Sequence, residues 1–229
     1  MIIRACTGQP SALQPVNRRP ARPQGRSPVP DDLEAERCET LAGILLAAGG
    51  ATRFGGPKQI ARIDGRTLVE RAARIMLATC PAGVVVVTGA RADAVTASLA
   101  GLPARLCHND AWSTGMAGSI RCGLDALPRG ASAALLLLCD QVAVDETDLR
   151  RLASTWACAP ARVAAARYAG TLGVPAIFPS DFWPELRALQ GDHGGRAVIA
   201  GRADVVIVDM PHAAVDIDTP AELGQASDN

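Results

Sequence analysis

The residues best suited to chemistry are concentrated in a glycine-rich segment near residue 50. Residues 46–58 read Leu-Ala-Ala-Gly-Gly-Ala-Thr-Arg-Phe-Gly-Gly-Pro-Lys. Glycine backbone N–H groups can turn toward an anion, and Arg53 and Lys58 add positive charge. The segment lacks the GK[ST] and GxGxxG patterns of the known phosphate loops. Its composition alone therefore leaves two alternatives, a phosphate-binding loop and a flexible connection.

Lysine usage favours the first alternative. Lys58 is the only lysine among the 23 lysine and arginine residues of the chain. A lone lysine in such an arginine-rich sequence suggests a place where a compact ammonium is needed and a guanidinium does not fit. Contact with a phosphate or a leaving group is one such place. The competing explanation is that one lysine has survived by chance.

Acidic residues provide candidate metal ligands. Asp140 directly follows the most apolar run of the sequence, 133–139, and a charge at the end of a buried strand needs a partner such as a metal ion. The alternative is that Asp140 caps the following turn. Asp216 and Asp218 share one face of an extended segment; Asp218 is slightly favoured as a second ligand, and it could also cap a last helix that has Pro220 in its first turn.

Two further polar segments follow predicted strands. Residues 109–119 are small and polar, and here Gly115 permits close backbone approach while Ser119 could donate to a phosphate or a base. Trp112 in the same segment is more typical of a core residue than of a stacking surface. Residues 191–195 read Gly-Asp-His-Gly-Gly, in which His193 could equally be an ordinary loop residue.

The elements that must position these residues alternate along the chain. Apolar runs predict strands at 43–48, 84–87, 104–108, 133–139, 162–168, 174–178 and 205–208, and helical spacing predicts helices at 67–79, 91–100, 117–126, 145–156, around 185 and from 220. Asp145 is the expected N-cap of its helix. This alternation predicts an α/β fold with a mostly parallel sheet covered by helices on both faces. Ligands of such folds lie beyond the carboxyl ends of the strands, where the glycines and Asp140 fall.

Composition limits the function classes. The 229 residues suit one domain at 39–229, preceded by an arginine- and proline-rich tail at 1–38 that we expect to be disordered. The chain is neutral overall and residues 1–30 carry five arginines and no acid, so the remainder has a net charge of about −5, which argues against a nucleic-acid partner. No apolar run approaches a membrane span, and we expect neither a secretory signal nor a membrane partner.

The seven cysteines are dispersed, with no CxxC pair. Their scatter and odd number predict reduced, buried thiols in a cytoplasmic protein, without disulfides or a zinc site. Three dispersed histidines make a histidine-built metal centre improbable, so that carboxylates are the expected ligands.

The segment 46–58 resembles the signature loop of the MobA-like nucleotidyltransferases and, within them, of the molybdenum cofactor cytidylyltransferases. The resemblance continues in the same order through Asn109–Ile120, Leu138–Gln141, Gly191–Gly195 and Asp216–Pro220, across about 180 residues. Two departures, Val142 after Asp-Gln and Gly195 after Gly194, put substrate details in doubt but leave the charged positions intact.

The resemblance implies a three-layer α/β/α fold with a Rossmann-like sheet of the nucleotidyltransferase type. It implies nucleotidyl transfer with Mg²⁺, in which Arg53, Lys58 and Asp140 are catalytic and Asp140 and Asp218 hold the metal. The nucleotide would contact Leu46, Ala47, Ala48, Gly49, Gly50, Arg53, Lys58, Gly115 and Ser119. A molybdopterin-type acceptor would lie near Asp192 and His193.

The resemblance also implies the partners of the reaction. Pro57-Lys58 weakly favours CTP over another nucleoside triphosphate as donor, and a molybdenum hydroxylase is an implied recipient of the product. A guanylyl- or other nucleotidyl-transferring relative and a non-catalytic molybdenum-cofactor accessory protein remain alternatives. A dinucleotide-dependent oxidoreductase is disfavoured because the loop lacks GxGxxG and no acid is suitably placed for a ribose.

Overall fold

Seven short apolar runs assemble into one sheet. The structure is a computed structural model that describes residues 36–50 and 54–216. The strands, in their order across the sheet, are β5 (Arg105–His108), β4 (Gly83–Thr88), β1 (Leu41–Ala47), β6 (Ala133–Leu138), β8 (Thr171–Pro179), β7 (Ala164–Tyr168) and β9 (Val206–Asp209). Neighbouring strands are parallel except where β8 pairs with β6 and with β7. The predicted mostly parallel sheet is therefore confirmed.

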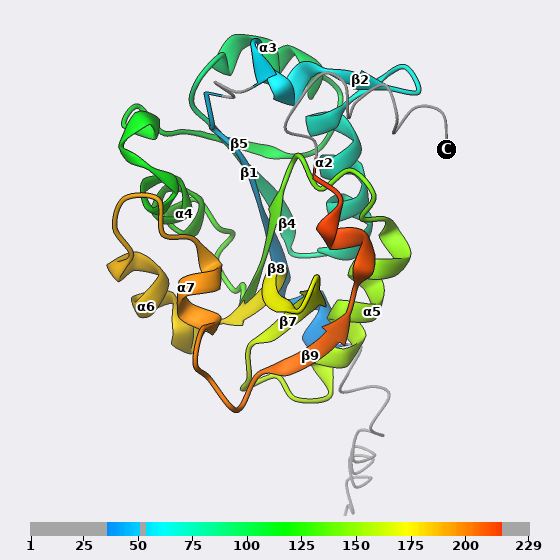
Figure 1. The fold of residues 1–229 in the computed structure, drawn as a ribbon, viewed down its shortest axis with the longest axis vertical. Coiled ribbons are helices and arrows are strands. Elements are labelled where there is room, and N and C mark those ends of the chain that lie inside the picture. The colour runs from blue at the N-terminus through cyan, green and yellow to red at the C-terminus, as the bar shows by residue number, and fades with distance from the viewer. Residues whose placement is uncertain (1–35, 51–53, 217–229) are drawn as a thin grey trace, which may run out of the picture.

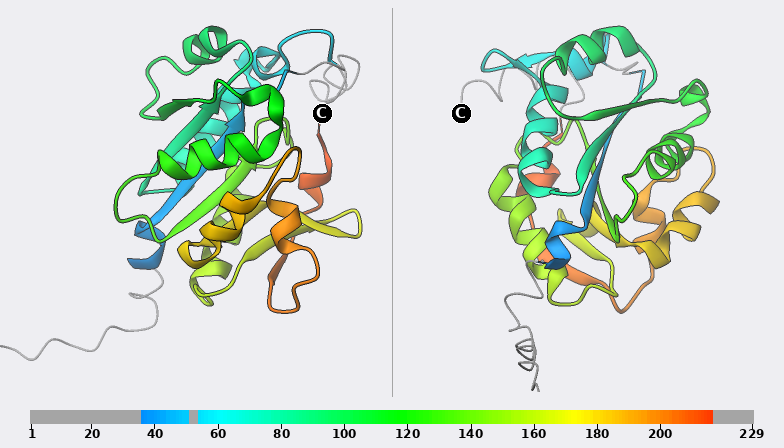
Figure 2. Two further views of the ribbon diagram at one scale, coloured as in Figure 1. Left: turned by 90° about the vertical axis from the view of Figure 1, so that its left-hand side faces the viewer. Right: turned by 180° about the vertical axis from the view of Figure 1, so that it is seen from behind.

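Helices cover both faces of this sheet (Figure 1). One layer contains α2 (Leu68–Thr79), α3 (Ala92–Ser98) and α5 (Glu146–Ala157). The opposite layer contains α4 (Met116–Asp125), α6 (Trp183–Ala188) and α7 (Gly195–Ile199). This second layer faces the viewer in the left panel of Figure 2. The arrangement confirms the three-layer α/β/α fold.

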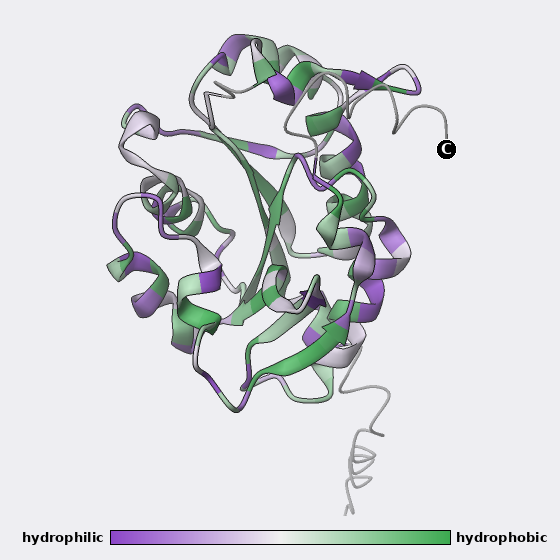
Figure 3. Cartoon of the chain, viewed as in Figure 1, coloured by the Kyte–Doolittle hydropathy of each residue, from purple (hydrophilic) through white to green (hydrophobic). Residues whose placement is uncertain are grey.

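The alternation of side chains along β1 builds two separate cores. Leu41 and Leu45 point into the core beneath α2 and α5, whereas Ile44 and Leu46 point into the core beneath α4, α6 and α7. Every residue of β1 is buried. Figure 3 shows that the central strands are hydrophobic, whereas hydrophilic residues are concentrated on the outer helices. A strand buried on both faces reads as a continuous apolar run, which is why the sequence located it.

Short polar caps begin two of the helices. The Thr67 hydroxyl accepts a hydrogen bond from the Glu70 amide, and Asp145 accepts one from the Asp148 amide at 2.8 Å. Asp145 is thus the N-cap that the sequence predicted.

Several small elements were not predicted. They are the two-residue strands β2 (Arg62–Ile63) and β3 (Arg66–Thr67), the 3-10 turns η2 (Lys58–Ile60), η3 (Trp112–Thr114), η4 (Ser180–Phe182) and η5 (Pro211–Ala214), and the helix α7. Each is too short to show a clear period in the sequence. The helix predicted from Pro220 lies outside the described residues.

The expectation that all cysteines are reduced is wrong for one pair. Cys107 on β5 and Cys122 on α4 form a disulfide, with Cα atoms 6.5 Å apart. The two residues are brought together because α4 lies across β4 and β5. Cys80 and Cys139 are buried and outside any disulfide, as expected.

A membrane-spanning helix is not found among residues 36–50 and 54–216: no helix there is both long and apolar enough to cross a bilayer.

Candidate functional site

The functional residues lie where β1 and β6 end. These strands are parallel neighbours, and Leu46 is the register partner of Leu138. The chain that leaves β1 through Ala48 and Gly49 therefore reaches the same level as the chain that leaves β6 through Cys139 and Asp140. The rule that ligands lie at the carboxyl ends of strands selected this edge from the sequence.

Lys58 and Asp140 form an ion pair at this edge. Lys58 Nζ lies 2.9 Å from Asp140 Oδ2, and the side chains are 9% and 26% exposed. An ammonium so thoroughly removed from water requires a partner, which the carboxylate provides. Lys58 is the first residue of the turn η2, and its contact with Asp140 joins two residues that are far apart in sequence.

Asp140 has a second carboxylate oxygen that could coordinate a cation. Its second oxygen, Oδ1, is buried and has no hydrogen-bond partner among the described residues. A buried carboxylate oxygen without a donor fits a bound cation, because a cation would supply the missing interaction. The described part of the chain contains no group of three or more His, Cys, Asp or Glu side chains that could hold a metal ion. A cation here would consequently need ligands from the substrate or from residues outside that part.

A cavity of about 490 Å³ opens beside this ion pair. The structure brings together in its lining ten residues that the sequence selected, namely Leu46, Ala47, Ala48, Gly49, Gly50, Lys58, Gly115, Ser119, Asp140 and Asp192. Gln59 also lines the cavity, and its amide donates a hydrogen bond to the Gly49 carbonyl. The sequence reasoning missed Gln59, although it adjoins the unique lysine.

The loop after β5 forms another wall of this cavity. Asn109 Nδ2 donates to Ser119 Oγ at 3.0 Å, and Asn109 Oδ1 accepts from the Ala111 amide at 3.1 Å. Gly115 has a φ of +117°, and a Cβ there would lie 2.2 Å from the Gly191 carbonyl oxygen. A glycine is therefore required for the loop after β5 to touch the segment that begins at Gly191.

Trp112 has a larger role at the site than the sequence suggested. A Cβ on Gly50 would lie 3.0 Å from its indole ring, and a Cβ on Gly89 would lie 2.5 Å from its Cβ. Trp112 thus packs against both glycines. It also lines a neighbouring cavity of about 660 Å³ that includes Gly89 and Arg91.

A second cavity of about 480 Å³ adjoins the first and shares Met116, Leu138 and Asp192 with it. The sequence-selected residues Asp192 and His193 both line it. Tyr168 and Arg196, which the sequence did not single out, are its other polar side chains. No motif marks them because they lie on β7 and α7, outside the segments that resemble the nucleotidyltransferases.

Tyr168, on the wall of this second cavity, has a phenol whose pKa is shifted. Burial raises the pKa of the Tyr168 phenol, with Arg196 acting to lower it and Asp216 to raise it. Arg196 lines the same cavity as Tyr168. Asp216 is exposed and lies at the end of the described chain, whereas Arg53 and Asp218 lie outside the described residues.

Cys139 separates Asp140 from β6 and lines the first cavity. Burial raises the pKa of its thiol well above the usual range, and the neighbouring Asp140 charge raises it further. Cys139 is consequently a neutral thiol at physiological pH and contributes no charge to the site.

Comparisons with known proteins agree with this geometry. The model of the MobA-like NTP transferase domain matches residues 43–215. Nicotine blue oxidoreductase from Paenarthrobacter nicotinovorans is 32% identical over 195 residues, which are 80% of this chain and 94% of that protein.

Solved structures of other proteins are similar to this chain. The crystal structure of Rv0371c from Mycobacterium tuberculosis H37Rv has a TM-score of 0.71 at 26% identity, covering 82% of this chain and 98% of that one. Its complex with manganese has a TM-score of 0.68 at 25% identity over the same shares. Molybdopterin-guanine dinucleotide biosynthesis protein A from Archaeoglobus fulgidus, at 17% identity, shares the fold with a TM-score of 0.60 over 82% of this chain and 97% of that one.

Three findings point to the same family: the strand order, the glycine-rich loop after β1, and the family match over most of the chain. This chain belongs to the MobA-like NTP transferase family.

Proposed function

We propose that this nucleotidyltransferase is a molybdenum cofactor cytidylyltransferase. It would join CTP to a molybdenum-bearing molybdopterin, giving the cytosine dinucleotide cofactor and pyrophosphate. The observation that carries the proposal is the Lys58–Asp140 pair beside a glycine-lined cavity, with Asp140 Oδ1 buried and without a hydrogen-bond partner among the described residues.

The first cavity is the proposed donor site. The backbone of Gly49 and Gly50 would receive the triphosphate, and Ser119 would donate to a phosphate or to the base. Lys58 supplies positive charge where the leaving pyrophosphate gains negative charge. Arg53, from the same loop, is proposed to contact the phosphates as well.

A divalent cation fits the donor site because Asp140 Oδ1 is buried and has no donor within the described part of the chain. Asp140 and Asp218 would hold it, with Asp216 as the alternative second ligand, and Mg²⁺ is the proposed ion. Rv0371c has been crystallised with manganese, which supports divalent metal binding in a relative. When bound, such an ion neutralises charge on the phosphates of the donor.

The second cavity is the proposed acceptor site. Arg196 would pair with the acceptor phosphate, and Asp192 and His193 would contact the rest of the molecule. An oxygen of the acceptor phosphate attacks the α-phosphorus of the donor; the new P–O bond forms as the bond between the α-phosphorus and the β-phosphate oxygen breaks, and pyrophosphate leaves. The shared wall of Met116, Leu138 and Asp192 supports direct contact between the two substrates.

The choice of CTP rests on Pro57-Lys58 and on the family resemblance. GTP or another triphosphate would use the same phosphate contacts and differ only at the base. The decisive experiment is pyrophosphate release with each of the four nucleoside triphosphates and Mg²⁺, with and without molybdenum-loaded molybdopterin.

We expect release with CTP only when the acceptor is present. Lys58→Ala should lower the rate at least about 100-fold, and Arg66→Ala, an exposed arginine that lines neither cavity, should leave it unchanged. No release with any triphosphate would reject the transferase proposal. Acceptor binding without release would instead indicate an accessory protein, and capture of a molybdenum hydroxylase by the loaded protein would support that reading.

An oxidoreductase is a second candidate, because the relative that is 32% identical over 195 residues is named nicotine blue oxidoreductase. The match covers 94% of that relative, so a protein of nearly the same extent carries the name of an oxidoreductase. The test is bleaching of nicotine blue by the protein with NADH or NADPH, followed spectrophotometrically. Bleaching without pyrophosphate release would replace the transferase proposal with this one.

A further inference from the structure

The chain between β5 and α4 is closed by a covalent bond. The disulfide joins Cys107, on β5, to Cys122, on α4, across a sequence separation of 15 residues. Between the two cysteines lie five residues that line the first cavity, namely Trp112, Ser113, Gly115, Met116 and Ser119. The wall that η3 and α4 give to the proposed donor site is thus enclosed in a single covalent loop.

The disulfide lies directly behind the polar contact that shapes this wall. Asn109, just after Cys107 in sequence, donates to Ser119 Oγ at 3.0 Å, and Ser119 comes shortly before Cys122. Asn109 and Ser119 are both buried. The disulfide and this hydrogen bond therefore join the end of β5 to α4 at neighbouring positions, and together they set the distance between the loop and the helix.

The strand β5 gains little from packing. It is a four-residue strand at the edge of the sheet, paired with β4, and Leu106 at its centre is 40% exposed. Arg105, at its start, donates to the Ala126 carbonyl after α4 at 3.1 Å, which holds the end farther from the cavity. Exposed edges with little apolar burial open at low free-energy cost. We therefore expect the disulfide to be the main restraint on the end nearer the cavity.

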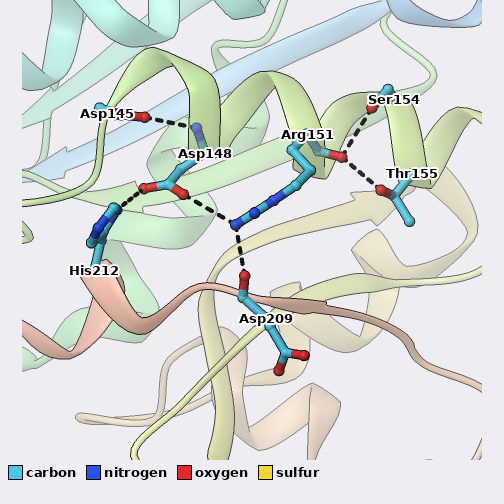
Figure 4. Close-up of polar contacts among 7 residues, drawn as sticks. All are labelled: Asp145, Asp148, Arg151, Ser154, Thr155, Asp209 and His212. Atoms are coloured by element: carbon cyan, nitrogen blue, oxygen red, sulfur yellow. Dashed lines mark hydrogen bonds and ion pairs between the residues drawn. The ribbon is translucent and has the colours of Figure 1, made fainter.

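The opposite edge of the sheet is attached by polar contacts (Figure 4). The edge strand there, β9, also has four residues. Arg151 of α5 donates to the Asp209 carbonyl at 2.6 Å and to the buried carboxylate of Asp148 at 3.2 Å. Asp148 also interacts with His212 Nδ1 of η5 at 2.7 Å. A reductant leaves these contacts intact, so the two edges of the sheet differ in their response to redox conditions.

The disulfide is within reach of a reductant, because neither Cys107 nor Cys122 is fully buried. A dithiol reduces it by exchange: one thiolate of the reductant attacks a sulfur of the disulfide, and the S–S bond of the protein breaks. The second thiol of the reductant then closes a disulfide within the reductant, which leaves both cysteines as thiols. Two electrons and two protons pass from the reductant to the protein.

We propose that the Cys107–Cys122 disulfide is a redox switch of the donor site. The oxidised protein holds the wall formed by residues 109–119 against the cavity, and reduction to the dithiol releases this wall and weakens binding of the nucleoside triphosphate. The switch rests on the proposed function, in which the first cavity binds the triphosphate. By thermodynamic linkage, the triphosphate makes the disulfide harder to reduce by the same factor.

Triphosphate affinity in the two redox states tests the switch. Calorimetry measures binding of each of the four nucleoside triphosphates with Mg²⁺ to the full chain, oxidised and after reduction with dithiothreitol; thiol alkylation and peptide mapping establish the state of Cys107 and Cys122. We expect the best-bound triphosphate to bind about tenfold more weakly to the reduced protein. The double variant Cys107→Ser with Cys122→Ser should show the weaker affinity under both conditions. If it fails to fold, reduced wild-type protein provides the same comparison.

Two matched controls separate the switch from general effects of reduction and of a loosened sheet edge. Cys158→Ser removes an exposed thiol outside the disulfide, and it should leave the tenfold difference intact. Arg151→Met removes an attachment of β9 at the opposite edge, and it should alter triphosphate affinity in neither redox state.

A redox titration tests the reciprocal effect. The fraction of disulfide is measured by alkylation and mass spectrometry across a series of thiol–disulfide buffers, with and without a saturating triphosphate. A tenfold coupling corresponds to a midpoint potential that is about 30 mV more negative when the triphosphate is bound.

The outcomes separate the switch from the transferase proposal. Equal affinity in both redox states, or a Cys107–Cys122 bond that is missing or that dithiothreitol does not open in the folded protein, would overturn the switch and leave the transferase proposal standing. A redox-dependent affinity in a protein that releases no pyrophosphate would reject the transferase and retain the switch. Failure to bind any triphosphate in either state would overturn both.

Discussion

Lys58 and Asp140 are 82 positions apart, and Lys58 is the only lysine among the 23 lysine and arginine residues of the chain. Asp140 Oδ2 faces the ammonium, while Oδ1 is left to another partner. An arginine at position 58 would present a planar fork that tends to engage both carboxylate oxygens. A lysine leaves one oxygen available, which gives a physical reason for the single exception to arginine use.

Asp140→Asn tests this division of the carboxylate. The amide oxygen can still accept from Lys58, so we expect the fold to persist with a stability loss of about 1–3 kcal/mol. The variant loses the negative charge that a cation requires, so Mn²⁺ binding should be abolished and turnover should fall at least about 100-fold. Calorimetry and pyrophosphate release check both effects.

The matched control is Asp110→Asn, which neutralises an exposed carboxylate near the site, one paired with His108. It should leave metal binding and turnover unchanged. Normal turnover in Asp140→Asn would remove Asp140 from the metal site.

At the scale of elements, α4 is pressed unusually close to the sheet. A Cβ at Gly123 would lie 2.5 Å from Ile44 Cγ2 on β1, whereas a Cβ at Gly118 on the same helix would lie 3.3 Å from Asn109 Nδ2. The close approach brings Ser119 within hydrogen-bond distance of Asn109. The depth at which α4 packs therefore contributes to the shape of the donor cavity.

Two substitutions on α4 separate packing from helix propensity. Gly123→Ala forces a methyl group into Ile44, and we expect it to lower the free energy of unfolding by about 1–3 kcal/mol. Gly118→Ala gains helix propensity against a mild contact, and its effect should stay within about 1 kcal/mol. Urea unfolding followed by circular dichroism distinguishes them, and equal effects would contradict the close packing at Gly123.

The sequence revealed the elements that carry a strong period. The continuous apolar runs of β1 and β6 located the centre of the sheet, and the rule for strand ends then located the cavity beside Asp140. The helix α7 was missed because it has five residues and begins at Gly195. The Cys107–Cys122 disulfide was missed because pairing depends on how α4 crosses β5, which cysteine spacing does not contain. Tyr168 on β7 and Arg196 on α7 line one cavity only because the fold brings these two elements together, so no local pattern marks them.

At the scale of the whole molecule, titration at high pH has few contributors, because the chain has one lysine and one tyrosine. Burial raises the pKa of Cys80 and of Cys139 far above the value of 9.0 that an unperturbed thiol has. Above that pH the unfolded chain loses these protons and the folded chain keeps them. The stabilisation is therefore complete below pH 9 and is lost as the pH rises.

We expect the free energy of unfolding to fall above pH 9 by up to about 1.4 kcal/mol per pH unit for each buried thiol. Cys80→Ala should remove the share of one thiol from this slope, whereas Cys158→Ser, at an exposed position, should leave it unchanged. Urea unfolding between pH 8 and pH 11 measures the slope. A flat profile would show that these thiols ionise in the folded state.

Trp112 gives the site an optical signal of its own. The chain has three tryptophans. Trp156 is buried in the core, and Trp183 donates a hydrogen bond to the Phe178 carbonyl. Trp112, in contrast, borders two cavities. A ligand entering either cavity replaces water beside the indole, which changes its emission. With Trp156→Phe and Trp183→Phe, Trp112 would be the single emitter. Donor candidates could then be ranked by fluorescence titration, without a label and independently of turnover.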